Sequence, residues 1–107
     1  MIWFAHGALA HTSCPASAFD SLIRMKPGYF ALEALACLRA ALAVFRQLGN
    51  TYGEAAADHS IGLAWRDRGR PRYAERYLRR AISLYQDLGR RTEEVAVARD
   101  LAAARSA

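Results

Sequence analysis

The stretch ALACLRAALAVFRQLGNTYGE, residues 34–54, returns in kind forty positions later as AERYLRRAISLYQDLGRRTEE, residues 74–94. A Leu-Gly pair, an aromatic residue and a glutamate stand at equivalent places in both copies. When the comparison is extended to residues 34–64 and 74–104, nine positions are identical. An alanine-rich chain matches itself often by chance, so the Leu-Gly, aromatic and glutamate matches decide that the repeat is real.

The composition favours helices. The chain has 107 residues, which fits one domain, and it is 53% hydrophobic and 23% charged, as globular proteins are. Alanine accounts for 23 residues, and it has the highest helix propensity and lets helix backbones approach closely. With only three prolines and few β-branched stretches, an all-β domain is excluded. No run of about 18 apolar residues is present, so we expect no membrane span.

Each copy of the repeat predicts two antiparallel helices. Apolar residues at three- and four-residue spacing predict long helices over residues 29–48, 51–68, 71–88 and 92–107. A shorter helix is expected over 15–25, and the segment 1–14 is expected either to be disordered or to pack on that first helix. The predicted fold class is therefore all-α, with stacked antiparallel helix pairs in a domain over 15–107.

The ends of these helices carry recognisable signals. Gly49 and Gly89 are expected to end their helices in a left-handed cap, and Pro71 is expected in the first turn of the next helix. Thr51 and Glu54 predict a capping box with Thr51 as the N-cap. Inward-facing positions are predicted at Leu35, Leu38, Leu42, Phe45 and Leu48 in the first long helix and at Ala98, Leu101 and Ala102 in the last.

The second and third long helices resemble the helix–turn–helix signature of the tetratricopeptide repeat (TPR) family. In that signature an apolar-Gly pair is followed by an aromatic residue, a turn glycine and a small-large-small ladder. The residues that carry the resemblance are Ile61, Gly62, Trp65, Gly69, Ala74, Leu78 and Ala81. The segment FRQLGNTYGEA, residues 45–55, is similar to the long-period TPR arrays of bacterial (actinobacterial-type) transcriptional regulators. The period here is 40 and not about 34, and the proline frequent between units is absent.

The resemblance implies a non-enzymatic protein–protein interaction scaffold, an α-solenoid of about two and a half repeats. The first helices of the pairs line its concave side, where a peptide or protein partner lies. The groove residues carried over are Phe19, Asp20, Ile23, Lys26, His59, Ser60, Leu63, Arg66, Asp67, Arg99, Asp100 and Ala103. Chaperone-binding members hold a terminal carboxylate with a Lys/Asn/Arg set, but His59 and Leu63 stand where Lys and Asn are needed, so that clamp is excluded. The plain alternative for each residue is a solvated position on an amphipathic helix.

A cluster of arginines supports a second hypothesis. The chain carries a net charge of +5, and seven arginines crowd around one turn: Arg66, Arg68, Arg70, Arg72, Arg76, Arg79 and Arg80. Guanidinium groups bind phosphate bidentately, so this cluster predicts nucleic-acid contact as the alternative function. Against it, no aromatic residues are interleaved for base stacking, and Arg72 and Arg76 are expected to face Glu75 and Asp67. Protein binding is therefore preferred over nucleic-acid binding.

Catalytic and metal motifs are missing from the sequence. There is no P-loop, dinucleotide-binding glycine motif, nucleophile elbow or HExxH, so we predict no enzyme and no cofactor. His6, His11 and Cys14 lack a fourth ligand, so no metal is expected. Cys37 is interpreted as a small buried hydrophobe and not as a disulfide partner. The N-terminus lacks the basic start and cleavage site of a signal peptide, which predicts a cytoplasmic protein.

The two ends of the predicted array support a third hypothesis. Helical arrays usually end in a polar-faced helix that covers the last unit. Here the last helix has no partner, and apolar residues at both ends are without an obvious cover: Trp3, Phe4, Leu9, Val97, Leu101 and Ala104. Either the N-terminal segment folds back over these residues, or they meet another chain. In the second case we expect docking onto a larger protein or a homo-oligomer, a self-associating helical domain with no foreign ligand.

Overall fold

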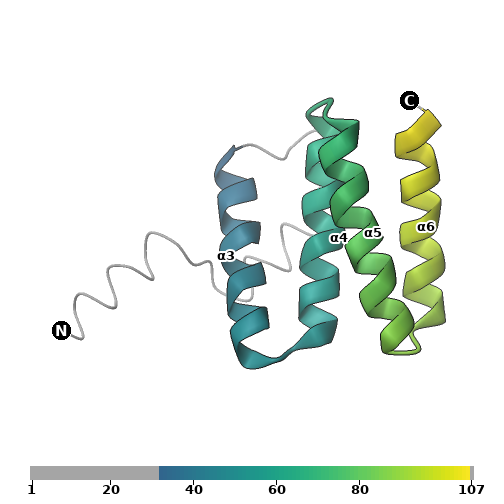
Figure 1. Cartoon of the computed structure of the whole chain (residues 1–107). Coiled ribbons are helices and arrows are strands. Elements are labelled where there is room, and N and C mark those ends of the chain that lie inside the picture. Colours follow the sequence, from purple (N-terminus) through teal and green to yellow (C-terminus); the bar gives the residue numbers. More distant parts are fainter. Residues whose placement is uncertain (1–31, 107) are drawn as a thin grey trace.

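The computed structural model describes residues 32–106. This part of the chain consists of four helices: α3 (Leu32–Leu48), α4 (Thr51–Asp67), α5 (Pro71–Asp87) and α6 (Arg91–Ser106). The helices run antiparallel, each packs on the next along the chain, and α4 also contacts α6 (Figure 1). The predicted all-α fold of stacked antiparallel helix pairs is confirmed for these residues. Outside them lie the segment 1–14, the helix expected over 15–25, the groove residues Phe19, Asp20, Ile23 and Lys26, and the metal candidates His6, His11 and Cys14.

Three turns of one kind connect the helices. Gly49, Gly69 and Gly89 all have positive φ angles, of 68°, 75° and 68°, which a residue with a Cβ rarely adopts. The residue after each glycine donates its backbone N–H to a carbonyl five residues earlier, at 2.9 Å in every turn. This is the Schellman arrangement, and it satisfies carbonyls that the end of a helix leaves unpaired. The caps predicted at Gly49 and Gly89 are confirmed.

The N-terminus of α4 differs from the expected capping box. Asn50 is the N-cap, and its side-chain oxygen accepts a hydrogen bond from the backbone N–H of Gly53 at 2.8 Å. Thr51 is already the first helical residue, so its predicted role as N-cap is wrong. The Schellman turn ends one residue after Gly49, which places Asn50 directly ahead of the helix, and asparagine is at least as good a cap as threonine. Glu54 instead binds Arg46, with Nε and Oε2 3.2 Å apart.

Asn50→Ala is expected to lower the free energy of unfolding by about 1 kcal/mol, because the N–H of Gly53 loses its acceptor. Thr51→Ala is the matched control and is expected to change it by less than about 0.5 kcal/mol. Urea unfolding followed by circular dichroism measures both. Equal losses of stability in the two variants, or a larger loss for Thr51→Ala, would show that Thr51 is the N-cap after all.

The core has two parts, one between α3 and α4 and one that joins the start of α4 to α5 and α6. The predicted α3 face is buried at Leu35, Leu38 and Leu42, but Leu48 is 73% exposed because the helix ends there. In α6 the inward face was predicted at Ala98, Leu101 and Ala102, and this is corrected to Val97, Leu101 and Ala104. Positions 97, 101 and 104 follow the helical period more closely, and Ala98 and Ala102 are exposed.

The burial of α6 removes one argument for self-association. Val97, Leu101 and Ala104 were expected to lack a cover, but they pack against α5 and α4 within the chain. The outward side of α6 carries mostly alanine and charged residues, with Val95 as its one large exposed apolar side chain. None of the helices described is long and apolar enough to cross a membrane.

Candidate functional site

One face of the molecule is shared by α4 and α6. His59 of α4 and Asp100 of α6 are 41 positions apart in the sequence, yet His59 Nε2 lies 2.7 Å from Asp100 Oδ2. Both side chains are partly buried, so the hydrogen bond ties the two helices together across their packing interface. Both residues were predicted groove residues, and the fold brings them onto a single surface, which we call the α4–α6 face.

The other predicted groove residues occupy different environments. Leu63 follows His59 by one helical turn on α4 and is half-buried. Arg66 lies 3.6 Å from the carboxylate of Asp67, and Arg99 is exposed. Ser60 is only 4% exposed, so it lies within the helix packing and not on an open surface. Ala103 is exposed on α6.

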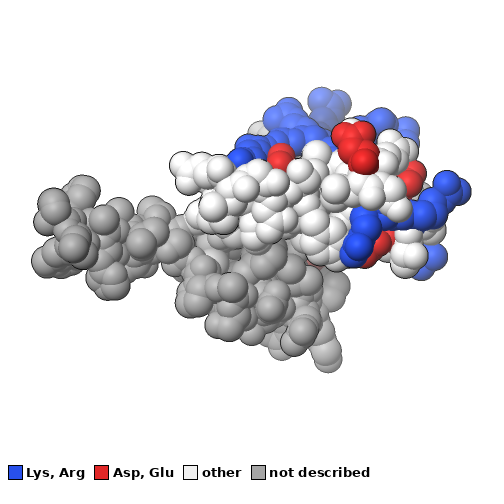
Figure 2. Space-filling model, turned by 90° about the horizontal axis from the view of Figure 1, so that it is seen from below, with Lys and Arg blue, Asp and Glu red and all other residues white. Residues whose placement is uncertain are grey.

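The arginine cluster is divided among several partners. Glu75 binds Arg79 at 2.8 Å and Asp67 binds Arg66, so the expected pairing of these acids with Arg72 and Arg76 is wrong. Glu75 and Arg79 are one helical turn apart, which suits an ion pair along the helix surface. In the described part of the chain, no ion pair involves Arg68, Arg70 or Arg72. Figure 2 shows Lys and Arg side chains gathered along the upper edge and right-hand end of the molecule.

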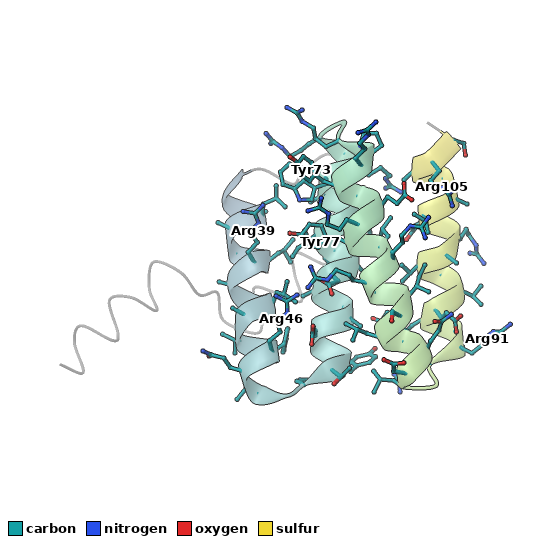
Figure 3. All side chains as sticks on the ribbon, viewed as in Figure 1. Arg39, Arg46, Tyr73, Tyr77, Arg91 and Arg105 are labelled. Atoms are coloured by element: carbon teal, nitrogen blue, oxygen red, sulfur yellow. The ribbon has the colours of Figure 1, made fainter. Side chains whose placement is uncertain are left out.

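Arginines and aromatic rings interleave where α3 and α5 flank α4. Trp65 of α4 and Tyr73 of α5 have ring centroids 4.9 Å apart, and the guanidinium of Arg39 from α3 lies over Trp65 at 5.8 Å. Arg76 lies over Tyr73 at 5.8 Å and Arg80 over Tyr77 at 5.6 Å, so the expectation that no aromatic residues are interleaved with the arginine cluster is wrong. Figure 3 shows Arg39 and Arg46 reaching from α3 toward α5, with Tyr73 and Tyr77 reaching back. The contacts join three helices through cation–π attraction.

A buried carboxyl group lies beneath these side chains. Asp58 of α4 is 0% exposed, and neither of its oxygens has a hydrogen-bond partner among residues 32–106. Burial raises the pKa of Asp58 from its ordinary 3.8 to about 7; Arg46 lowers it in part, and Glu54 raises it further. Arg80 approaches no closer than 3.9 Å. The carboxyl group therefore holds a proton more tightly in the folded chain than it does in water.

The sequence analysis predicted neither the buried Asp58 nor the arginines and tyrosines around it, although the sequence pattern contained an indication of each. Asp58 falls between Ala57 and Ile61, two positions of the predicted apolar face, where a charged residue is out of place. Arg39 and Arg46 are seven positions apart, which places them on one face of α3. Their proximity to the tyrosines of α5 depends on how the helices pack, which the sequence pattern does not state.

A second polar cluster closes the other end of the fold. Arg90, in the α5–α6 turn, lies over the ring of Tyr52 at 4.5 Å and donates to Glu93 at 3.1 Å. Tyr52 also packs edge-on against Tyr85, with centroids 5.8 Å apart. Burial raises the pKa of Tyr85 to about 12. A hydrogen bond from its own backbone, with Arg90 beside it, holds the pKa of Glu93 below its ordinary value. This cluster joins the starts of α4 and α6 and has the character of a structural contact.

Two further expectations concern cysteine and metal. Cys37 is buried in α3, as expected, but it is disulfide-bonded, so its interpretation as an unpaired small hydrophobe is wrong. A buried thiol and a buried half-cystine occupy similar apolar positions, and the sequence pattern does not distinguish them. Within residues 32–106, no group of His, Cys, Asp and Glu side chains is arranged to hold a metal ion.

Comparison of the chain with protein-family models, with curated proteins and with solved structures found no match.

Proposed function

We propose that this chain is a non-enzymatic protein–protein interaction scaffold, a short TPR-like array that binds a peptide or protein partner on its α4–α6 face. The observation that supports the proposal most directly is the contact between His59 and Asp100. This contact joins α4 and α6, and it supports the proposal because helical repeats build extended binding faces from equivalent helices of successive pairs.

The chemistry of the α4–α6 face suits a peptide. Leu63 offers a half-buried apolar contact, and Arg66 follows it on α4 at the spacing of about one turn. Arg99 is an exposed charged residue beside Asp100 on α6. An apolar centre with a polar rim is the usual composition of a protein interface. The same proposal includes a role within a regulatory system and a cytoplasmic location. The disulfide at Cys37 counts against that location, because cytosolic thiols are kept reduced.

Affinity capture from a nuclease-treated lysate of the source organism tests the proposal. The test variant is His59→Ala, Leu63→Ala, Arg66→Ala, and the matched control is Gln47→Ala, Ser83→Ala, Arg91→Ala, which changes three exposed residues elsewhere and also removes one arginine. We expect a protein that the wild type and the control retain and the test variant loses. Circular dichroism and thermal melting establish that both variants fold.

A nucleic-acid-contacting role is the second candidate. It is favoured by Arg68, Arg70 and Arg72, which lie around the α4–α5 turn with no ion pair in the described part of the chain and are exposed. Omitting the nuclease separates the two roles. Recovery of nucleic acid that the His59, Leu63, Arg66 variant leaves unchanged would contradict the protein-binding proposal and support this one.

A further inference from the structure

We propose that the surface between α3 and α5 is a second binding site, which takes an acidic peptide segment. We call it the arginine–tyrosine face and define it by Arg39, Arg46, Tyr73, Arg76, Tyr77 and Arg80. It involves none of the residues assigned to the α4–α6 face, so it stands or falls independently of the function proposed above.

The first argument is charge. The face carries four arginines, and two acidic groups lie near them. Glu54 binds Arg46, and Asp58 is fully buried 3.9 Å from Arg80. Arg39 and Arg76 contact only aromatic rings among the described residues, and both are exposed. The face therefore retains an excess of positive charge, which complements a ligand that carries several carboxylates.

The second argument is the orientation of the guanidinium groups. Arg39, Arg76 and Arg80 each lie over a ring, at centroid distances of 5.8, 5.8 and 5.6 Å. An aromatic ring beneath a guanidinium restricts the side chain and leaves the N–H groups at its edge available. Those N–H groups form a fork that matches the two oxygens of a carboxylate. The rings thus hold the arginines in place for a ligand before it binds.

The third argument distinguishes an acidic peptide from a nucleic acid. Single-stranded nucleic acids bind through bases that stack on open aromatic faces. Here Trp65 is stacked against Tyr73 and covered by Arg39, while Arg80 lies over Tyr77. These contacts cover part of each ring, and of the three rings only Tyr73 is largely exposed, at 46%. The groups that remain for a ligand are therefore mainly the arginine N–H donors.

The spacing along α3 indicates which peptide fits. Arg39 and Arg46 are seven residues apart, or about 10 Å along the helix axis. In a peptide in the polyproline II conformation, which has three residues per turn, acidic residues at every third position lie on one side and recur about every 9 Å. A segment with that pattern can reach both ends of the face.

Fluorescence anisotropy with two synthetic peptides tests the proposal. One peptide has glutamate at every third position, and the other has glutamine in its place. We expect the full-length chain to bind the glutamate peptide, with affinity falling as salt is raised, and not to bind the glutamine peptide. Failure to bind the glutamate peptide at low salt, or equal binding of both peptides, would overturn the proposal.

Two double variants separate this face from general attraction to a basic protein. Arg39→Gln with Arg76→Gln is expected to weaken binding at least about tenfold, because two forked contacts are lost. Arg68→Gln with Arg70→Gln removes the same charge at the α4–α5 turn and is expected to weaken it less than about threefold. Equal losses would show attraction to charge alone and overturn the proposal.

Two further controls test whether the loss of binding reflects the guanidinium geometry and whether the ligand is a peptide. Arg39→Lys with Arg76→Lys keeps the charge but loses the forked geometry, and an intermediate affinity is expected. An affinity equal to that of the wild type would overturn the role of the guanidinium forks. The last comparison is with an oligonucleotide of similar length. If the chain binds it more tightly than the glutamate peptide, and the Arg39→Gln, Arg76→Gln variant loses that binding, the face belongs to nucleic acid and the acidic-peptide proposal is overturned.

Discussion

Asp58→Asn is expected to stabilise the protein at alkaline pH and to leave its stability nearly unchanged in acid. Because burial raises the pKa of Asp58 to about 7, the folded chain binds this proton more tightly than the unfolded chain, whose pKa is near 3.8. The stability that the proton confers is fully present below about pH 4 and is lost as the pH rises through 7. A pKa difference of about three units between the folded and unfolded chains corresponds to a loss of about 4 kcal/mol in the free energy of unfolding when the group is fully ionised. Asparagine is neutral throughout, so the variant avoids that loss.

Urea unfolding at pH 4, 6 and 8 measures the effect. The difference between Asp58→Asn and the wild type is expected to grow with pH, toward a few kcal/mol at pH 8. Asp87→Asn, which removes an exposed carboxylate at the end of α5, is the matched control and should alter stability by less than about 0.5 kcal/mol. If Asp58→Asn is less stable than the wild type at pH 8, Asp58 is ionised and favourably paired in the folded chain, and the account of its burial is wrong.

Gly62→Ala is expected to destabilise the fold, although alanine is the better helix former. A Cβ at position 62 would lie 2.7 Å from the Cγ and Cδ2 atoms of Leu78 and 3.2 Å from the carbonyl oxygen of Ala74. Leu78 is fully buried, so a shift of its side chain would have to be accommodated within the core. Overpacking of this kind lowers the free energy of unfolding by about 1–3 kcal/mol. The higher helix propensity of alanine raises it by only about 1 kcal/mol, so a net loss is expected. Thermal and urea unfolding measure the net loss, which should be larger for Gly62→Val.

A double-mutant cycle with Leu78→Ala identifies the cause. Alanine lacks both the Cγ and the Cδ atoms of leucine, so the added Cβ at position 62 no longer meets the side chain at position 78. In this background Gly62→Ala should be neutral or stabilising, with a coupling of about 1 kcal/mol or more between the two positions. An unchanged penalty would mean that the close approach of α4 and α5 is not what requires glycine.

Much of the fold is predictable because its turns are local. Glycine at positions 49, 69 and 89 is required by positive φ angles, and these turns, twenty residues apart, set the helix lengths. The errors occurred where two local solutions compete. Asn50 and Thr51 are adjacent potential caps, and in α6 so many alanines are present that the apolar period does not select between Val97 and Ala98.

The candidate sites were predictable to different degrees. His59 and Asp100 were named together because the TPR resemblance places the first helices of successive pairs on one side, and the two side chains are in contact in the structure. Arg39 and Tyr73 come from α3 and α5, which the repeat relates, but they do not occupy equivalent positions, and Trp65 comes from α4 between them. Only the packing of α3 and α5 on α4 therefore reveals their contact. The burial of Asp58 likewise depends on helices on both sides of it.

The most direct test of the protein-binding role is photo-crosslinking in cells of the source organism. The photo-reactive variant Leu63→p-benzoylphenylalanine places the probe on the α4–α6 face, and Ser83→p-benzoylphenylalanine places it at an exposed position of α5 as the control. We predict a protein partner that crosslinks at position 63 and not at position 83. Crosslinks at position 63 only to nucleic acid or to other copies of the chain, or equal capture at the two positions, would contradict the account.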